Sequence, residues 1–246
     1  MMNAKAQEII VKGIVLQASN VGEADRRLVV LTKQLGKITV FAYGAKRQKS
    51  PLLAVANPFV CGDFTISRGN GAYRLQSVKC DNYFRELMED FDKSCIGFYF
   101  LEFASYFTFE NMECTDYLNL LYQSFKALLN KNIPDKLIRY IFELKMFTLN
   151  GEAPEVYHCF KCKQMVESGY FLLDKKCIVH SECGNSKNIE LNHSAVYTLQ
   201  YIISAPISKL YTFTVSDEVF LQIEKFMNEY RNSMITYKFK SAAFLV

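Results

Sequence analysis

The stretch LVVLTKQLGKITVFAY, residues 28–43, indicates how the first part of the chain folds. Leu28–Thr32 and Ile38–Tyr43 are short runs rich in β-branched and aromatic residues, which are typical of strands. The connection Gln34-Leu-Gly-Lys37 between them is short, and glycine adopts the backbone angles that a tight turn requires. We therefore expect two neighbouring antiparallel strands here.

Three further runs of the same kind flank this pair: Ile9–Leu16, Phe59–Ser67 and Ala72–Val78. Gly69-Asn-Gly71 separates the last two and is a strong hairpin signal, because both residue types tolerate positive φ. Five short antiparallel strands suit a small closed barrel, since closure leaves no exposed sheet edge. The sequence predicts a five-stranded barrel of the oligonucleotide/oligosaccharide-binding (OB) type over residues 1–80.

After Asp81 the apolar residues recur with the period of a helix. Pro134 suits the first turn of one helix and Gly151 its end, while Asn192 and Ser216 are suitable N-caps of two later helices. The apolar stripes of the first two helices are formed by Ile96, Tyr99, Phe100, Phe103 and Phe107, and by Leu118, Leu121, Tyr122, Phe125 and Leu129.

The expected organisation is therefore α+β. A helical domain would occupy residues 81–155 and 189–246, and residues 156–188 would be a small insertion within it. Half of the 246 residues are hydrophobic, and the chain has only 11 Gly and 5 Pro, which excludes disordered and collagen-like classes. No apolar run is long enough to span a membrane, and the N-terminus has no signal-peptide pattern, so we expect a soluble cytoplasmic protein without membrane partners.

Four of the eight cysteines crowd into the expected insertion. Cys159-Phe-Lys-Cys162 has the two-residue gap that lets two thiolates approach one ion, and His180-Ser-Glu-Cys183 repeats it. These four residues predict a structural Zn²⁺ site, with Cys177 as a competing fourth ligand and His158 as a weaker one. The alternative is a degenerate finger that folds without metal. Four candidate ligands leave no open position for catalysis.

Positive charge is concentrated near the N-terminus. Residues 1–80 carry 12 Lys and Arg against 4 Asp and Glu, whereas the remaining 166 residues carry 17 against 21. Such a division predicts a polyanionic partner for the barrel. The cations that we expect to contact nucleic-acid phosphates are Lys46, Arg47 and Lys49 in the loop after the third strand, with Arg26, Arg27, Lys37, Arg68 and Arg74 as weaker candidates.

Tyr43 and Tyr73 lie beside these cations and are candidates for base stacking, although a core role is at least as reasonable for each. The sequence has no phosphate-binding glycine loop, nucleophile elbow or HExxH motif, so we expect no enzyme. Two alternative classes are an RNA-binding or ribosome-associated ribbon protein and a metal-dependent enzyme that acts on nucleic acid.

A set of short segments runs in a characteristic order over nearly the whole chain: Gly13-Ile-Val-Leu16, Gly22-Glu-Ala-Asp25, Leu31-Thr32, Leu35-Gly-Lys37, Tyr43-Gly-Ala-Lys-Arg47 with Lys49-Ser50, Asn57-Pro58-Phe59, Phe142-Glu-Leu-Lys145, Asn150-Gly-Glu-Ala-Pro154, Cys159-x-x-Cys162 and Tyr237-Lys-Phe-Lys-Ser241. In these segments the sequence resembles the RecO family of bacterial recombination mediators. In that family a cysteine usually stands where His180 is found in the second knuckle, His180-x-x-Cys183, so this chain would offer a Cys₃His set.

The resemblance implies an N-terminal OB domain that binds single- and double-stranded DNA at the bacterial nucleoid, and an ability to anneal complementary strands. It also implies partner proteins: RecR, the acidic-hydrophobic C-terminal tail of single-strand-binding protein and, indirectly, RecA, which the mediator helps to load during recombinational repair. None of these activities requires bond chemistry.

Overall fold

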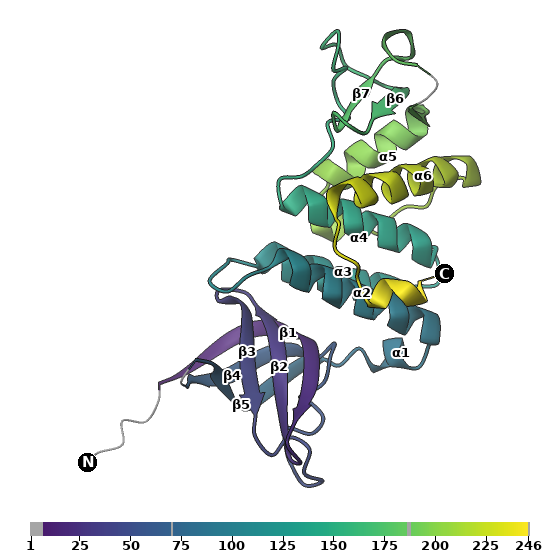
Figure 1. Cartoon of the computed structure of the whole chain (residues 1–246). Coiled ribbons are helices and arrows are strands. Elements are labelled where there is room, and N and C mark those ends of the chain that lie inside the picture. Colours follow the sequence, from purple (N-terminus) through teal and green to yellow (C-terminus); the bar gives the residue numbers. More distant parts are fainter. Residues whose placement is uncertain (1–6, 70, 186–187, 246) are drawn as a thin grey trace. The chain divides into compact units, whose positions relative to one another are not determined.

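The computed structural model describes residues 7–69, 71–185 and 188–245 and divides into two compact units (Figure 1). Unit 1 comprises Met1–Phe125 together with Phe239–Val246, and unit 2 comprises Lys126–Lys238. The chain therefore leaves unit 1, forms unit 2 and returns to unit 1 with its last residues.

Unit 1 begins with five strands: β1 (Glu8–Val21), β2 (Asp25–Thr32), β3 (Gly36–Ala42), β4 (Cys61–Arg68) and β5 (Tyr73–Asn82). They form a closed barrel in the order β1-β2-β3-β5-β4. All neighbours are antiparallel except β3 and β5, which run parallel. The expected OB-type barrel and the α+β class are confirmed.

Strand β3 shows why this sequence forms the barrel wall. Ile38, Val40 and Ala42 are buried and alternate with the half-buried Lys37, Thr39 and Phe41, as expected for a strand with one face on the core. Gly36, the first residue of β3, has φ +66°, so the predicted tight turn is present and its exit into the strand depends on glycine.

Strand β1 runs five residues beyond the predicted Ile9–Leu16. Its first half, Glu8–Ile14, pairs with β4, whereas Gly13–Val21 pairs with β2 across a register shift between Val15 and Gln17. A bulge bends a strand and increases its twist, so the single strand β1 can pair with both β2 and β4 and thereby close the barrel. The alternation of the sequence breaks at this bulge, which is why periodicity alone ended the strand too early.

The predicted hairpin connects β4 and β5. The Gly69 N–H donates to the carbonyl of Ala72 at 2.9 Å, and Gly71 has φ +76°; Asn70 of this motif lies outside the described residues. Strand β5 continues to Asn82, beyond the predicted Val78.

Unit 1 also contains α1 (Arg85–Met88), α2 (Phe91–Phe107), most of α3 (Thr115–Leu129) and the 3₁₀ helix η3 (Ser241–Phe244). The returning C-terminal segment packs on α2. Phe239 is buried, with its ring 5.1 Å from that of Phe103, and Glu102 accepts hydrogen bonds from the N–H groups of Lys240 and Ser241 at 3.0 and 2.9 Å.

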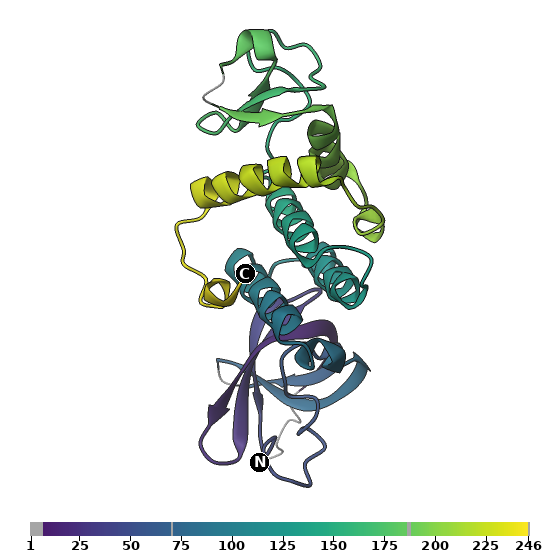
Figure 2. The same cartoon turned by 90° about the vertical axis from the view of Figure 1, so that its right-hand side faces the viewer.

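Unit 2 contains the helices α4 (Asp135–Leu149), α5 (His193–Ser204) and α6 (Asp217–Met234) and the 3₁₀ helix η2 (Ile207–Lys209), and α6 crosses α4 (Figure 2). Helix α4 starts and stops close to the predicted positions: Pro134 is its N-cap and not a residue of its first turn, and Gly151 follows its C-cap with φ +74°. Asn192 and Ser216 are the N-caps of α5 and α6, as expected.

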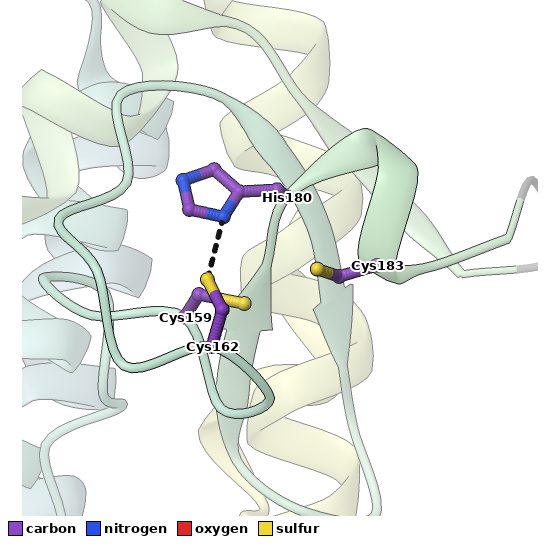
Figure 3. Close-up of side chains that lie close together, drawn as sticks. All are labelled: Cys159, Cys162, His180 and Cys183. Carbon is purple, nitrogen blue, oxygen red and sulfur yellow. Dashed lines mark hydrogen bonds between the residues drawn. The ribbon is translucent and has the colours of Figure 1, made fainter.

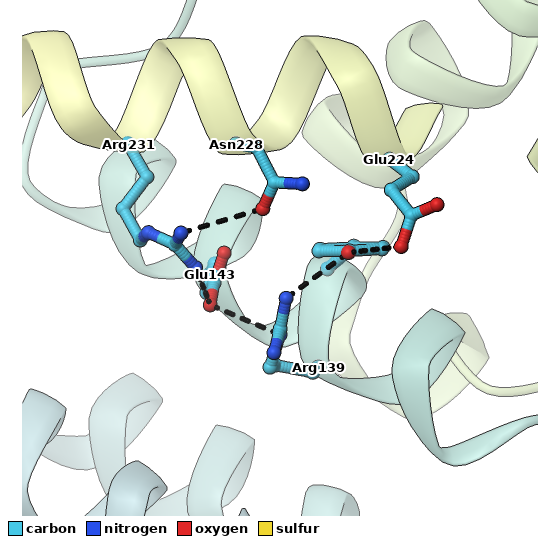
Figure 4. A network of polar contacts seen from close by, with 6 residues as sticks. Arg139, Glu143, Glu224, Asn228 and Arg231 are labelled. Carbon is cyan, nitrogen blue, oxygen red and sulfur yellow. Dashed lines mark hydrogen bonds and ion pairs between the residues drawn. The ribbon is translucent and has the colours of Figure 1, made fainter. Parts of the chain in front are cut away.

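A polar network joins α4 to α6 in unit 2 (Figure 4). Glu143 is fully buried and lies 3.5 Å from Arg139 Nε and 3.2 Å from Arg231 Nη1. The Tyr140 hydroxyl accepts a hydrogen bond from Arg139 and donates to Glu224, both at 3.0 Å. A buried carboxylate needs such partners, because removing one of them leaves an uncompensated charge.

Residues between α4 and α5 form the small insertion. Its sheet has the order β7-β6-β8 and consists of β6 (Gly169–Leu172), β7 (Cys177–Val179) and β8 (Ile189–Leu191), with the 3₁₀ helix η1 (Ser181–Cys183) after β7. Among the described residues, no helix combines the length and the apolar character needed to cross a bilayer.

Candidate metal centre and nucleic-acid interface

The two predicted pairs of metal ligands, the knuckles Cys159-x-x-Cys162 and His180-x-x-Cys183, come together in the insertion (Figure 3). Cys159 and Cys162 lie in the turn before β6, His180 directly precedes η1, and Cys183 is the last residue of η1. Their ligand atoms all lie within 4.8 Å of one another. Three sulfur atoms and one imidazole at this separation form a cluster that can hold a single metal ion.

The His180 ring is oriented for metal ligation. Its Nε2 lies 2.9 Å from the carbonyl oxygen of Met165, so this nitrogen carries the proton and donates it. The other nitrogen, Nδ1, faces the cysteines, 3.3 Å from Cys162 Sγ. A backbone carbonyl that fixes the tautomer of a ligating histidine is typical of metal sites, and the Met165 carbonyl also raises the pKa of His180.

The backbone around Cys159 favours a thiolate. Burial alone would raise the pKa of this thiol, but the N–H groups of Cys162, His180 and Lys161 donate to the sulfur and lower its pKa to about 6. Thiolate is the form of cysteine that binds metals. Three cysteine sulfurs and one imidazole nitrogen make four ligands, which is the number and type that tetrahedral Zn²⁺ prefers.

The two competing ligands lie elsewhere. Cys177 is buried in β7, where it pairs with Leu172, and burial raises the pKa of its thiol. His158 is exposed, with Nδ1 3.8 Å from Glu155. Neither belongs to the four-residue cluster, in which His180 and Cys183 lie close to Cys159 and Cys162.

The basic loop after β3 has an anchored backbone, and its cations are exposed at Arg47 and Lys49 and half-buried at Lys46. The Gly44 N–H donates to Asp25 Oδ1 at 2.7 Å, and the Lys46 N–H donates to the carbonyl of Ala24 at 2.9 Å. Within the described ranges, no hydrogen bond or ion pair involves the side-chain nitrogens of Lys46, Arg47 and Lys49. These cations are therefore available to an anionic ligand.

Two of the weaker candidates are engaged inside the protein. The Lys37 ammonium donates to the carbonyl of Ser105 and lies 5.9 Å from the centre of the Phe109 ring, and burial lowers its pKa. The Arg26 guanidinium donates to the carbonyl of Ala56 at 2.7 Å and to the Asn57 side chain. Both cations stabilise unit 1.

The remaining candidates, Arg27, Arg68 and Arg74, are exposed on the barrel. Arg27 pairs with Phe41 across β2 and β3, and Phe41 pairs with Arg74 across β3 and β5. We call Arg27, Phe41 and Arg74 the cross-strand row. Sequence reasoning did not single out Phe41; its outward position could be recognised from the alternation with Ile38, Val40 and Ala42.

Comparisons with known proteins agree with this architecture. A family model described as "Recombination protein O N terminal" matches residues 6–84, and one described as "Recombination protein O C terminal" matches residues 88–243. The DNA repair protein RecO of Acetivibrio thermocellus is 28% identical over 236 residues, which is 95% of this chain and 94% of that protein. The DNA repair protein RecO of Clostridium perfringens is 27% identical over 238 residues, 95% of each chain.

A third curated relative, the DNA repair protein RecO of Alkaliphilus metalliredigens, is 28% identical over 222 residues, 89% of this chain and 90% of that protein. The two family models together cover both the barrel and the helical part with its Cys₃His cluster. The chain therefore belongs to the RecO family of DNA repair and recombination proteins.

Proposed function

We propose that this protein binds single- and double-stranded DNA through its N-terminal barrel and acts as a recombination mediator without bond chemistry of its own. The observation that carries the proposal is the placement of five cations. Lys46, Arg47 and Lys49 lie in the loop that follows β3, and Arg27 and Arg74 flank Phe41 on the barrel face at the end of the same strand. Such cations neutralise phosphates and release counterions, which gives sequence-independent binding.

Membership of the RecO family supports a proposal of further activities. We propose that the protein anneals complementary strands and, with RecR, helps to load RecA onto single strands coated by single-strand-binding protein, whose C-terminal tail it recognises. The relatives named above are DNA repair proteins, which supports a role in recombinational repair.

We also propose a structural Zn²⁺ held by Cys159, Cys162, His180 and Cys183. When bound, the ion would cross-link the two knuckles, and this would stabilise the small insertion, which has little core of its own. The corresponding division of the chain is an OB domain (1–80), a helical domain in two parts (81–155 and 189–246) and the zinc finger (156–188).

The DNA proposal is tested with the triple variant Lys46→Ala/Arg47→Ala/Lys49→Ala. Removal of each phosphate-binding cation should make the log–log salt dependence on a single strand shallower by about 0.7, so the triple variant should differ from the wild type by about 2. The measurement is the affinity for a fluorescent oligonucleotide over a range of salt concentrations.

The matched control is Lys136→Ala/Lys209→Ala/Lys225→Ala, which removes the same charge from exposed positions of unit 2. An unchanged slope in the loop variant, or an equal change in the control, would contradict the assigned DNA path. Competition with an RNA of the same length tests the RNA-binding alternative. An annealing assay with and without single-strand-binding protein then tests the mediator role.

A further inference from the structure

The outer face of the barrel has a groove that the basic loop does not fill. It has a volume of about 440 Å³ and is lined by residues of β3, the turn that follows β3, β5 and the β4–β5 hairpin: Phe41, Tyr43, Gly69, Ala72, Tyr73 and Arg74. Three of its six lining residues are aromatic: Phe41 and Tyr43 lie on the outer face, whereas Tyr73 is half-buried and also packs against the barrel core. This composition is unusual for a surface that is only solvated.

Two of the aromatic rings form a platform. The rings of Phe41 and Tyr43 have centres 6.1 Å apart and planes inclined by only 19°. Tyr43 is 51% exposed, so its ring is not part of the hydrophobic core. The Arg74 guanidinium lies 5.2 Å from the centre of the Tyr43 ring. Arginine in this position combines a cation–π contact with free donors for a phosphate.

The strand register holds the platform in place. Phe41 is an outward-facing residue of β3, and Tyr43 directly follows the last residue of this strand, with its ring beside that of Phe41. Phe41 is in turn bracketed by the cross-strand row, with Arg27 on β2 and Arg74 on β5. Each stacking ring is therefore adjacent to a cation, and three different strands contribute to one continuous surface.

We propose that this groove binds the unpaired bases of single-stranded nucleic acid, which stack on Phe41 and Tyr43 while Arg27 and Arg74 contact the flanking phosphates. This inference rests on the proposed DNA-binding function and adds the feature that distinguishes single strands from duplex. In a duplex the base faces are covered by their neighbours and cannot stack on protein rings, whereas every unpaired base has an available face.

The two parts of the interface then respond differently to salt. Contacts of Lys46, Arg47 and Lys49 with phosphates weaken steeply as salt increases, on single strands and duplex alike. Stacking in the groove persists at high salt and applies to single strands alone. When two strands pair, their bases leave the groove, so the paired product keeps only the salt-sensitive contacts and dissociates more readily than its precursors.

The test is the double variant Phe41→Ala/Tyr43→Ala, measured with a dT oligonucleotide and with a blunt duplex of equal length. By the usual contribution of stacking, its affinity for the single strand should fall by about 10-fold or more, with an unchanged salt slope, while its affinity for the duplex should stay within about 2-fold. A dT oligonucleotide with consecutive abasic sites should show the same fall in affinity on the wild type and no further fall on the variant.

Two variants serve as controls. Phe41→Leu/Tyr43→Leu keeps apolar bulk on the outer face without the rings and should reproduce the fall in affinity, which separates stacking from an effect on folding. Tyr197→Ala removes an exposed tyrosine of α5 and should leave both affinities unchanged. An equal fall on duplex and single strand, or no fall in either groove variant, overturns the inference.

These outcomes are distinct from failure of the proposed function. A wild-type protein that binds DNA with the expected salt slope, together with groove variants that bind equally well, refutes only the base-binding groove. A wild-type protein that binds neither DNA form refutes the proposed function itself.

Discussion

Gly36, the first residue of β3, lies against the backbone of Phe109, which follows α2. A Cβ atom added to Gly36 would lie 2.0 Å from the carbonyl oxygen of Phe109. The same carbonyl accepts a hydrogen bond from the Lys37 N–H at 2.9 Å, and the Asn111 N–H donates to the carbonyl of Leu35 at 2.8 Å. The turn is therefore paired with the segment after α2 as in a short antiparallel ladder, and this joins the barrel to the helices of unit 1.

The first prediction concerns this close approach of Gly36 to Phe109. Gly36→Ala should lower the free energy of unfolding by about 3 kcal/mol or more, because the new methyl group meets backbone and the residue also keeps φ +66°. Gly22→Ala is the matched control: it has φ +56° but nothing within 4 Å of its added Cβ, so its stability should fall by only about 1 kcal/mol. Urea unfolding measures the stability of both variants. Equal losses of stability would show that the close approach of Gly36 to Phe109 does not add to the cost of the substitution.

The second prediction concerns the metal. Purified, folded protein should contain one Zn²⁺ per chain, and Cys162→Ser should lower both the zinc content and the melting temperature, because binding is coupled to folding of the finger. Cys95→Ser, a half-buried cysteine of α2 outside the cluster, should retain the zinc. Elemental analysis and thermal unfolding provide the measurements. Folded wild-type protein with almost no zinc would disprove the assignment.

The third prediction distinguishes the fourth ligand. His180→Ala should abolish stoichiometric zinc binding, whereas Cys177→Ala should retain it and lower stability only by the contribution of a buried side chain, about 1 kcal/mol. His180→Cys should restore binding, because it completes a four-cysteine set. Retention of zinc by His180→Ala together with its absence from Cys177→Ala would reverse the choice of ligand.

The fourth prediction concerns Lys145, a buried lysine of α4. Its ammonium donates to the carbonyls of Ile203 and Ala205 at 2.8 and 2.7 Å, at the C-terminal end of α5. Lys145→Met keeps the aliphatic stem but leaves these carbonyls without the charged donor, which should cost about 1–3 kcal/mol. The exposed Lys136→Met on the same helix should change stability by less than about 0.5 kcal/mol. Urea unfolding of the two variants measures both effects, and equal stabilities would contradict a stabilising role of the buried ammonium.

The fifth prediction is a pH dependence. Burial raises the pKa of Tyr140 from its ordinary value of 10.0 to about 12. Between pH 10 and about 12 the folded state keeps the proton and the unfolded state releases it, so stability falls as pH rises through this window. Tyr140→Phe should therefore show a shallower alkaline decline in stability than the wild type, although its stability at pH 7 is lower because it cannot form the hydrogen bonds with Arg139 and Glu224. Parallel pH profiles of the two proteins would contradict this.

Most strands and helices and the two metal-ligand knuckles can be recognised from local sequence alone. The alternation around Ile38 and Val40 and the glycine of the β2–β3 turn predict a strand pair, because side-chain direction in a strand and positive φ are local properties. Likewise the gaps Cys159-x-x-Cys162 and His180-x-x-Cys183 predict a four-ligand cluster, because two ligands in one turn can reach the same ion without any long-range information.

Which charged and aromatic residues share a surface depends on how the strands and helices pack in three dimensions. Lys37 and Arg27 look alike in the sequence, yet the Lys37 ammonium is held by Ser105, far along the chain, while Arg27 lies in the cross-strand row. The row itself depends on the parallel pairing of β3 with β5, and the return of Phe239 to α2 brings it against Phe103 from a distant part of the sequence. Such contacts depend on register and chain path, which are set by packing of the whole unit and leave no periodic signal near the residues concerned.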